Sequence, residues 1–388
     1  MKLVLISGSL PAVRCGIGEY TARLASQLAL APGVSVQILT TKTELAHPEA
    51  VAPSQVMLVD NWGLPSIIRL ARLIRHQQPD VVHIQYPAVG YARSLGVLFL
   101  PLAFRFLARV PVVLTIHERS EKRWHGRLAT DFMALTSSRV VFPDPLEAEA
   151  LRDRLRVFGT RIDVAEMIST IPINREADRA AFRARLGLAP GEFLVGTFGL
   201  IHPRRRLEDL IDGLAALRRS TPARLLIVGG EADYDAERAR EYMAALKRKI
   251  DQLGLFCAVT WLGYVSAAEV SAALQACDVA ALLYREGASQ RNTTLEAALE
   301  HRLPVVTTDG PATSDSLRAT PNIYFVRAGA YTPFDLAQAI LSAARTGWVD
   351  AVQPAIASRL SDQVAWHLSL YRELVGRQSG TPIGAPPS

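Results

Sequence analysis

Short runs of Val, Ile and Leu alternate with stretches of helical spacing along the chain, and this alternation constrains the fold most. In the first half the runs are KLVLIS, VSVQILT, DVVHIQY, PVVLTI and RVVFPD, with VAEMIST as a further candidate. They lack the in-and-out alternation of a sheet with one wet face, as expected when helices cover both faces. The intervening stretches, such as GEYTARLASQLAL, have amphipathic helical spacing. The pattern predicts an α/β fold with doubly wound parallel sheets.

The same pattern starts again in the second half of the chain. The runs there are FLVGTFG, ARLLIVGG, VTWLGYV, DVAALLY, PVVTT and IYFV. We therefore expect two Rossmann-like domains, at residues 1–170 and 190–360, facing each other across a cleft. Ligands of such folds bind beyond the carboxyl ends of the strands, so the candidate site residues are sought there.

The composition narrows the class of protein. The chain has 388 residues, 49% of them hydrophobic and 21% charged, which suits a globular protein of two domains. Its three scattered cysteines, Cys15, Cys257 and Cys277, form no disulfide framework and no zinc motif, which favours a reducing cytoplasm. The N-terminus MKLVLISGS is too quickly polar for a signal peptide and indicates a first strand.

The net charge and the most apolar segment indicate whether the chain binds phosphates, nucleic acid or a membrane. The net charge of +6 attracts phosphates, but no long basic run with interleaved aromatic residues supports nucleic-acid binding. The segment Leu95–Ile116 is interrupted by Pro101, Arg105 and Arg109, so we expect a helix and a buried strand rather than a membrane span. Leu95–Arg109 can also lie on an anionic membrane surface; burial is favoured unless the acceptor is lipid-linked.

Glycines follow the first strand, in the loop that leads to an amphipathic helix. Gly8, Gly16 and Gly18 would let backbone N–H groups approach a phosphate or sugar there. The spacing is not G-x-G-x-x-G, so turn chemistry explains them equally well. His117 directly follows PVVLTI, where a neutral imidazole can hydrogen-bond a sugar hydroxyl; a core or surface histidine is the alternative. His83 lies within its strand and is interpreted as structural.

Two strand ends of the second half carry charged residues. After FLVGTFG, the turn contains Arg204, Arg205 and Arg206, which form either a phosphate site or a solvated basic surface. After DVAALLY, the loop REGASQRN leads to a helix with Asn292 or Thr293 as its N-cap, whose free N–H groups suit a diphosphate. Glu296, about one turn in, can bind a ribose diol or complete a capping box with Thr293.

Together these segments resemble the retaining glycosyltransferases of the GT-B fold, family 4, over roughly residues 2–374. The motifs that carry the resemblance are FGLIHPRRRLEDLIDGL, RLLIVGGEA, WLGYVSAAEVSAAL, the segment from Glu286 to PVVTT, and a Trp-containing helix around Trp366. The resemblance implies that this last helix, at about 362–376, packs back on the first domain. The Gly/Pro/Ser-rich residues 378–388 are expected to be disordered.

The resemblance also implies roles for individual residues. Gly18 matches a glycine loop that approaches the donor phosphates, and His117 matches a histidine that touches the transferred sugar. Arg205 matches a lysine that neutralises the diphosphate, Glu296 a glutamate that binds the ribose, and Tyr264 a residue lining the base pocket. The predicted catalytic residues are His117, Arg205 and Glu286. The predicted donor-binding residues are Gly16, Gly18, Gly199, Arg204, Tyr264, Arg291, Asn292, Thr293, Thr294 and Glu296.

The chain departs from the family pattern at two places. Nine residues separate Glu286 from Glu296, whereas the family usually has seven, and the family spacing leads back to Ala288. Either the loop carries a two-residue insertion or the first, sugar-contacting glutamate is absent. Leu200 also stands where the family commonly has a phosphate-binding arginine. Arg204, Arg206 or Arg291 can substitute for it.

The expected function is transfer of a sugar from a nucleotide diphosphate sugar to a sugar or lipid-linked acceptor hydroxyl, with retention, in polysaccharide, glycolipid or glycoconjugate synthesis. No cofactor and no metal are expected, because no Asp-x-Asp pair lies at a strand end. The protein is expected in the cytoplasm, with the inner face of the membrane as a further site. The alternatives are a non-catalytic protein of this fold and a sugar-nucleotide epimerase; the donor, acceptor and oligomeric state stay open.

Overall fold

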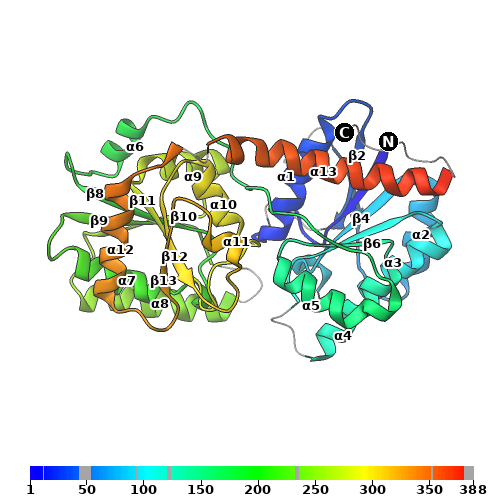
Figure 1. The fold of residues 1–388 in the computed structure, drawn as a ribbon, viewed down its shortest axis with the longest axis horizontal. Helices are drawn as coiled ribbons and strands as arrows, with labels where there is room; N and C mark the ends of the chain where they lie inside the picture. Colours follow the sequence, from blue (N-terminus) through cyan, green and yellow to red (C-terminus); the bar gives the residue numbers. More distant parts are fainter. Residues whose placement is uncertain are drawn as a thin grey trace. The chain divides into compact units, whose positions relative to one another are not determined.

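The computed structural model describes residues 1–11, 13–42, 54–92, 94–119, 124–231, 236–350 and 353–379. The chain divides into two compact units. Unit 1 comprises Met1–Ile168 and Leu360–Ser388, and unit 2 comprises Ser169–Arg359. Each unit has its own parallel sheet with helices on both faces (Figure 1).

Unit 1 has a seven-stranded parallel sheet in the order β3-β2-β1-β4-β5-β6-β7. Its strands are β1 Lys2–Ile6, β2 Ser35–Thr41, β3 Gln55–Val59, β4 Val81–Tyr86, β5 Val112–Ile116, β6 Arg139–Phe142 and β7 Ile162–Val164. The strand order reverses between β1 and β4, and this is where ligands bind in doubly wound sheets.

The helices of unit 1 lie in two layers. On one face of the sheet, α2, α3, α4 and α5 enclose an apolar core. On the other face, α1 and α13 enclose a second core. The bounds are α1 Gly16–Ala29, α2 Ser66–Gln77, α3 Leu100–Ala103, α4 Trp124–Thr136, α5 Pro145–Leu155 and α13 Gln353–Ser379, with short turns η2 Val89–Tyr91, η3 Leu95–Phe99, η4 Phe104–Ala108 and η5 Arg156–Phe158.

Unit 2 repeats the architecture with a six-stranded parallel sheet in the order β10-β9-β8-β11-β12-β13. The strands are β8 Phe193–Phe198, β9 Ala223–Val228, β10 Val259–Gly263, β11 Val279–Leu282, β12 Val305–Asp309 and β13 Ile323–Arg327. The order reverses between β8 and β11. The loops that follow these two strands are therefore the natural ligand-binding loops of the unit.

Helices cover both faces of this sheet as well. One core includes α6, α9, α10 and α11, and the other includes α7, α8 and α12. The bounds are α6 Arg179–Arg185, η6 Pro203–Arg205, α7 Leu207–Leu217, α8 Ala236–Gln252, α9 Ala267–Ala276, α10 Thr293–Glu300, α11 Asp315–Arg318 and α12 Pro333–Thr346. The α/β fold class predicted from the alternating pattern is confirmed.

The structure corrects several element boundaries. β3, an edge strand with the run VMLV, was missed; of its five residues only Val59 is buried. VAEMIST is not a strand; the seventh strand is Ile162–Val164, which ends at the first residue of this run. Leu95–Arg109 is not one helix but a 3₁₀ turn, a short α-helix and a π-type turn in succession. Pro101, which cannot donate a backbone hydrogen bond, lies in the middle of this segment.

The C-terminal helix is longer than expected. α13 extends over Gln353–Ser379 rather than 362–376, so it includes two residues of the segment expected to be disordered. Residues 380–388 lie outside the described residues. From Leu360 onward the helix belongs to unit 1. Tyr371 and Leu374 take part in the core that α13 forms with the sheet.

Candidate functional site

Arg205 lies at the carboxyl edge of the second sheet, at the point where the strand order reverses. It ends the turn η6 after β8, and its guanidinium reaches the first residues of α10, the helix that follows β11. Nη1 donates to Thr294 Oγ1 at 3.2 Å, and Nη2 donates to the carbonyl of Phe198. Two loops that are distant in sequence are thus joined by one cation.

Tyr284 completes this arrangement. The guanidinium carbon of Arg205 lies 4.8 Å from the centroid of the Tyr284 ring, a cation–π geometry. The Tyr284 hydroxyl and Thr294 Oγ1 are 2.7 Å apart. The sequence interpretation missed Tyr284 because it ends the apolar run DVAALLY and was counted with the strand. Its position two residues after β11 was the available signal.

The described neighbours of the Arg205 guanidinium are uncharged. Within the described part of the chain it donates only to neutral oxygens and forms no ion pair with a carboxylate. The N-terminus of α10 beside it adds the positive end of a helix dipole. A cation and a helix N-terminus together are the arrangement that binds the oxygens of a phosphate or diphosphate.

Gly199 makes room for this arginine. Its φ of +121° is a conformation that L side chains rarely adopt, and a Cβ at this position would collide with the Arg205 guanidinium. Gly199 therefore contacts the cation directly. The structure brings together three predicted site residues, Gly199, Arg205 and Thr294, and adds Tyr284.

The neighbouring arginines differ from Arg205. Arg206 has φ +48° and is paired with Asp209 at 2.6 Å and with Glu208 at 3.5 Å. These carboxylates raise the pKa of Arg206 against the opposing effect of burial. Arg206 is thus engaged with two carboxylates of the same unit. Arg204 is exposed, and its backbone carbonyl accepts a hydrogen bond from Arg285 at 3.0 Å.

The loop before α10 is held by backbone contacts. Glu286 has an exposed side chain, while its carbonyl accepts from the Ala312 N–H at 2.9 Å. Ala288, at the family position of the first glutamate, is fully buried, and its N–H donates to Thr308 O at 2.8 Å. Ser289 N donates to Asn292 Oδ1 at 2.8 Å. The loop is therefore well defined without any carboxylate at the position of Ala288.

The first turn of α10 favours one of the two interpretations of Glu296. Asn292 occupies the cap position without a side-chain capping hydrogen bond, and Thr293 is the first helical residue. Thr293 and Glu296 are therefore not placed as the cap and third residue of a capping box. The Glu296 side chain is 8% exposed. Arg291 and Asn292 are partly buried beside this turn.

Tyr264 follows β10, at the far end of the same sheet edge. Its side chain is 42% exposed. Gly263 before it accepts a backbone hydrogen bond from Gly229 at 2.8 Å, and this fixes the end of the strand. The described contacts do not join Tyr264 to Arg205.

In unit 1, His117 lies one residue beyond the end of β5. Its ring is 6% exposed and packs edge-on against Tyr20, with centroids 5.3 Å apart. Nε2 is 2.7 Å from Gln85 Oε1, and the backbone N–H donates to Tyr86 O at 2.8 Å. Burial lowers the pKa of His117 to about 3, so the imidazole is neutral at physiological pH.

The two glycines at the start of α1 lie inside the helix rather than in the loop before it. A Cβ at Gly18 would stand 2.9 Å from the carbonyl oxygen of Ser9, so this glycine allows the helix to approach the end of β1. A Cβ at Gly16 would meet nothing within 4 Å. Close packing therefore accounts for Gly18, and Gly16 has no steric requirement.

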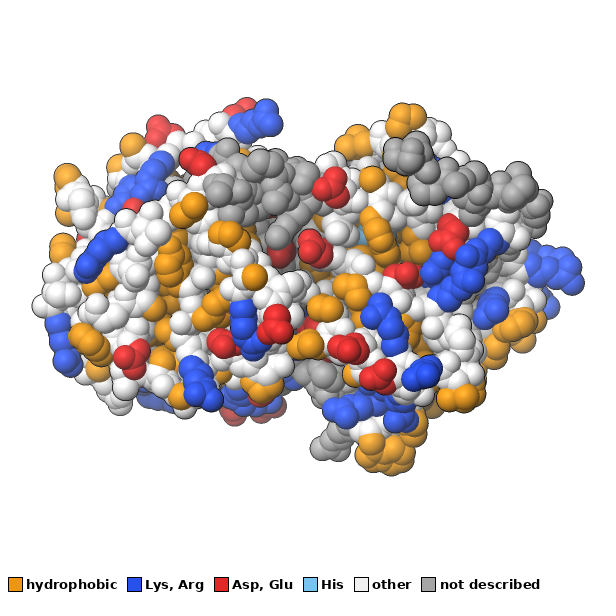
Figure 2. All heavy atoms as spheres, viewed as in Figure 1, with side chains coloured by type: hydrophobic (Ala, Val, Ile, Leu, Met, Phe, Trp, Pro, Cys, Tyr) orange, Lys and Arg blue, Asp and Glu red, His pale blue; other side chains and the backbone are white. Residues whose placement is uncertain are grey.

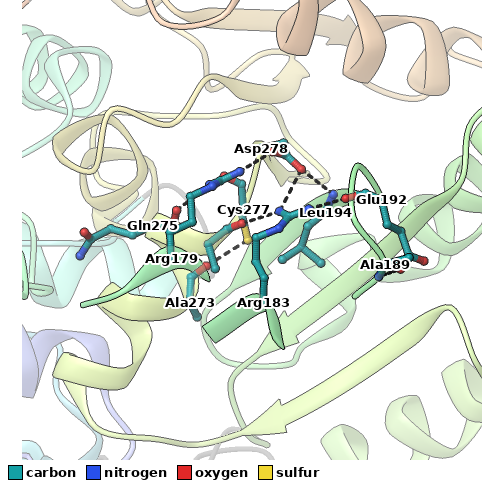
Figure 3. Close-up of polar contacts among 10 residues, drawn as sticks. Arg179, Arg183, Ala189, Glu192, Leu194, Ala273, Gln275, Cys277 and Asp278 are labelled. Atoms are coloured by element: carbon teal, nitrogen blue, oxygen red, sulfur yellow. Dashed lines mark hydrogen bonds and ion pairs between the residues drawn. The ribbon is translucent and has the colours of Figure 1, made fainter. Parts of the chain in front are cut away.

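A second group of charges, at the opposite edge of sheet 2, is fully paired (Figure 3). Asp278, just before β11, pairs with Arg179 at 2.5 Å and Arg183 at 3.3 Å and accepts from Leu194 N at 2.7 Å. The shallow hollow lined by Arg183 and Asp278 lies there, at the amino ends of β8 and β11. Burial raises the pKa of the Cys277 thiol to about 12. This cluster anchors α6 to the sheet.

No group of three or more His, Cys, Asp or Glu side chains is arranged to hold a metal ion within the described ranges. Across those same ranges, every helix is too short or too polar to cross a bilayer.

Comparison with known proteins matches both halves of the chain. The family model described as glycosyl transferases group 1 matches residues 192–346, and that described as glycosyl transferase 4-like domain matches residues 15–166. The D-inositol 3-phosphate glycosyltransferase of Stackebrandtia nassauensis is 27% identical over 68% of this chain and 65% of its own length. The Nocardia farcinica protein of the same name is 29% identical over 64% and 59%. The chain thus spans less than two thirds of these relatives.

Solved structures share the architecture. Anabaena HepE, in complex with UDP and glucose, has a TM-score of 0.70 at 17% identity and covers 95% of this chain and 99% of its own. A glycosyltransferase of Rickettsia africae has a TM-score of 0.74 at 15% identity, covering 96% and 98%. At these identities the likeness concerns the fold. With both domain models matched in order and this fold, the chain belongs to the group 1 glycosyltransferases, family 4, of the GT-B fold.

Proposed function

We propose that this chain transfers a sugar from a nucleotide diphosphate sugar to an acceptor hydroxyl. The observation that carries the proposal is Arg205, a cation without a carboxylate partner among the described residues, held at the N-terminus of α10 where the strand order reverses. The relatives support it: HepE was solved with UDP and glucose, and the Stackebrandtia protein is named a glycosyltransferase.

The leaving group explains why such a cation is needed. Breaking the bond from the anomeric carbon to the phosphate oxygen leaves negative charge on the diphosphate. Arg205 and the N–H groups at the start of α10 would stabilise that charge in place, which is the most effective form of electrostatic catalysis. Glu296, a buried carboxylate in the first turn of α10, would accept hydrogen bonds from the ribose hydroxyls.

We propose retention of configuration at the anomeric carbon. The acceptor oxygen would form its bond on the face that the diphosphate leaves, and a phosphate oxygen would take the acceptor proton. His117, a neutral and buried imidazole, would orient the sugar. In this scheme no metal and no cofactor takes part, since the arginine and the helix terminus carry the charge stabilisation.

A release-and-transfer assay tests the proposal. UDP-, GDP-, ADP- and TDP-sugars are offered with and without EDTA, and free nucleotide and glycosylated product are measured. Arg205→Ala should lower turnover by about 10²–10³-fold. Arg219→Ala, an exposed arginine after α7 at the opposite sheet edge, should leave it unchanged. An epimerase would convert the sugar without releasing nucleotide, and equal activity of both variants would move the phosphate role away from Arg205.

The acceptor is proposed to be a sugar or lipid-linked hydroxyl at the inner face of the membrane. Between Asn61 and His117 the sequence has six arginines, and Asp80 is its single acidic residue. Asp80 is engaged by the N–H of Lys2 at 2.6 Å. The segment therefore favours an anionic surface.

Exposed apolar side chains accompany these arginines. Phe106 is 60% exposed, Leu107 52% and Trp124 74%. They belong to η4 and α4, on the helical layer that also contains α2. Figure 2 shows hydrophobic and basic side chains together over the α4 end of unit 1. Apolar anchors among cations are the pattern of a surface that lies on anionic lipid.

Vesicle co-sedimentation tests this contact. The protein should pellet with vesicles containing phosphatidylglycerol and not with phosphatidylcholine alone. The double variant Phe106→Ser/Leu107→Ser should lose most of the binding, whereas Phe256→Ser, an equally exposed aromatic in unit 2, should keep it. If the protein pellets with neither kind of vesicle, the proposed membrane contact is contradicted, and the proposed transfer reaction is not affected.

A further inference from the structure

A chain of buried polar side chains connects His117 to the C-terminal helix. His117 Nε2 is 2.7 Å from Gln85 Oε1, and Gln85 Nε2 is 3.2 Å from His83 Nε2. His83 Nδ1 is 2.7 Å from the hydroxyl of Tyr371, on α13. Gln85 and Tyr371 are fully buried and His83 is 1% exposed. No water is needed to complete the chain, and every link lies within unit 1.

Strand register explains how these residues meet. His83 and Gln85 are two residues apart on β4, so their side chains lie on one face of the sheet. Gln85 is paired with Thr115 on β5, two residues before His117. Thr115 Oγ1 is 2.7 Å from His83 Nε2. The face is the one covered by α1 and α13, where an apolar core would otherwise be expected.

The amide of Gln85 gives this chain a direction. Its oxygen faces His117, so it accepts a hydrogen bond from Nε2–H of that ring. Its NH₂ faces Nε2 of His83, which must accept, so His83 holds its proton on Nδ1 and donates to Tyr371. Burial lowers the pKa of both imidazoles, so each ring is neutral and carries one N–H proton. His117 is left with Nδ1 as its hydrogen-bond acceptor.

We propose that Gln85 and Tyr371 are positioning residues, which hold His117 as the Nε2–H tautomer and leave Nδ1 to accept a hydrogen bond from a hydroxyl of the transferred sugar. The contact between Nδ1 and the sugar rests on the proposed function. The tautomer of His117 does not depend on that function. A donor sugar is then recognised through a hydroxyl hydrogen, and a donor with a fluorine or hydrogen in place of that hydroxyl is discriminated against.

The tautomer is measured directly in the resting protein. Long-range ¹H–¹⁵N correlation spectra of protein labelled with ¹⁵N-histidine distinguish Nε2–H from Nδ1–H, and His117→Gln assigns the signal. We expect Nε2–H for His117 and Nδ1–H for His83. The opposite pair, which a reversed Gln85 amide would impose, overturns the proposal whether or not the protein transfers sugar.

Variants then test the link to turnover. Gln85→Leu should lower kcat by about tenfold to a hundredfold with KM for the donor within about twofold, because the ring loses its fixed orientation. Gln85→Glu keeps an acceptor oxygen for His117 and should recover most of the loss. Tyr371→Phe should change the His83 signal and lower kcat less.

The control is Tyr91→Phe, which removes a buried tyrosine hydroxyl of unit 1 that donates to the backbone carbonyls of Ile6 and Gln85. It should lower stability without changing the His117 tautomer. An Nε2–H tautomer with full turnover in Gln85→Leu contradicts the positioning role. If the wild-type protein transfers no sugar, the proposed function and the sugar contact of Nδ1 are both contradicted. The spectra would still show whether Gln85 holds His117 as the Nε2–H tautomer.

Discussion

At the scale of single residues, two adjacent arginines differ in the groups that they contact. Arg206 is neutralised by Asp209, whereas Arg205 has only neutral oxygens and an aromatic ring as neighbours in the described part of the chain. The run RRR shows that a cation is available, and Asp209, three residues on, hints at the partner of Arg206. What the sequence does not show is that Arg205 meets Tyr284 and Thr294, which are supplied by a loop 80 residues away through the sheet order.

The first prediction concerns Gly199. Gly199→Ala should displace the Arg205 guanidinium, because the new Cβ would occupy its place. Transfer should fall nearly as far as in Arg205→Ala, and donor binding should weaken in parallel, as measured by isothermal titration with the nucleotide sugar. The positive φ adds a strain of about 1 kcal/mol.

Gly254→Ala separates strain from displacement. Gly254 also has a positive φ, +65°, but a Cβ there meets nothing within 4 Å. This variant should lose stability to a similar extent and keep its donor affinity. If Gly199→Ala binds donor as the wild type does, Arg205 does not contact the diphosphate.

At the scale of elements, the start of α10 matters most. The helix begins at Thr293, and Glu296 is a buried carboxylate in its first turn. The sequence placed the N-cap at Asn292 or Thr293, and the structure selects Asn292. A capping box with Glu296 as its third residue would need Thr293 at the cap position, so this boundary favours the ribose interpretation.

The second prediction follows from this helix. Glu296→Gln should raise the Kd for the donor nucleotide by about tenfold, the loss of roughly 1.4 kcal/mol expected when a charged acceptor of two hydroxyls becomes neutral. Glu300→Gln, one turn further along α10, is the control and should leave the Kd unchanged. Titration calorimetry with the nucleoside diphosphate measures both. Equal affinities for all three proteins would remove Glu296 from the ribose site.

Strands and helices were predictable to different degrees. Central strands such as β5 and β11 are fully buried, so their apolar runs were visible in the sequence. The edge strand β3, of which only Val59 is buried, was overlooked although it contains the apolar run VMLV. In Leu95–Arg109 the apolar run correctly indicated helical turns, but Pro101 and the αL conformation of Arg109 divide and end it. Tertiary packing, which the local sequence does not record, sets these breaks.

At the scale of the whole molecule, both sheets have the same order around their first strand. On one side of the first strand lie β2 and β3 in the first sheet and β9 and β10 in the second, and the later strands continue on the other side. The strand–helix alternation predicted doubly wound parallel sheets, and right-handed crossovers leave few strand orders for such a sheet. The polar chain from His117 to Tyr371 was not predictable, because it joins residues 254 positions apart through strand register and α13.

The third prediction is acid sensitivity of unit 1. Burial lowers the pKa of His117 to about 3 and that of His367 to about 4, and it lowers that of His83 as well. Unfolded histidines titrate near pH 6.5, so the unfolded state binds more protons below that pH and stability is lost as the pH falls. By pH 5 the free energy of unfolding should fall by about 2 kcal/mol for His117 and again for His367, relative to pH 8.

His367→Phe isolates one of these contributions. The Nε2 of His367 is buried without a hydrogen-bond partner in the described structure, so the replacement removes an unsatisfied polar atom and keeps a ring. Urea unfolding at pH 8 and pH 5 should show a loss smaller by about 2 kcal/mol than in the wild type. Identical losses in the two proteins would mean that His367 is protonated in the folded state.

The measurement that tests the central claim most directly is thermal unfolding with UDP, GDP, ADP or TDP, without metal, for the wild type and Arg205→Ala. A ligand that binds only the folded protein raises the melting temperature by mass action. We predict that one nucleoside diphosphate stabilises the wild type and that Arg205→Ala abolishes most of the shift. No shift with any nucleotide, or the same shift in both proteins, would contradict a diphosphate site at Arg205 and the start of α10, and a total absence of shift would favour a non-catalytic protein of this fold.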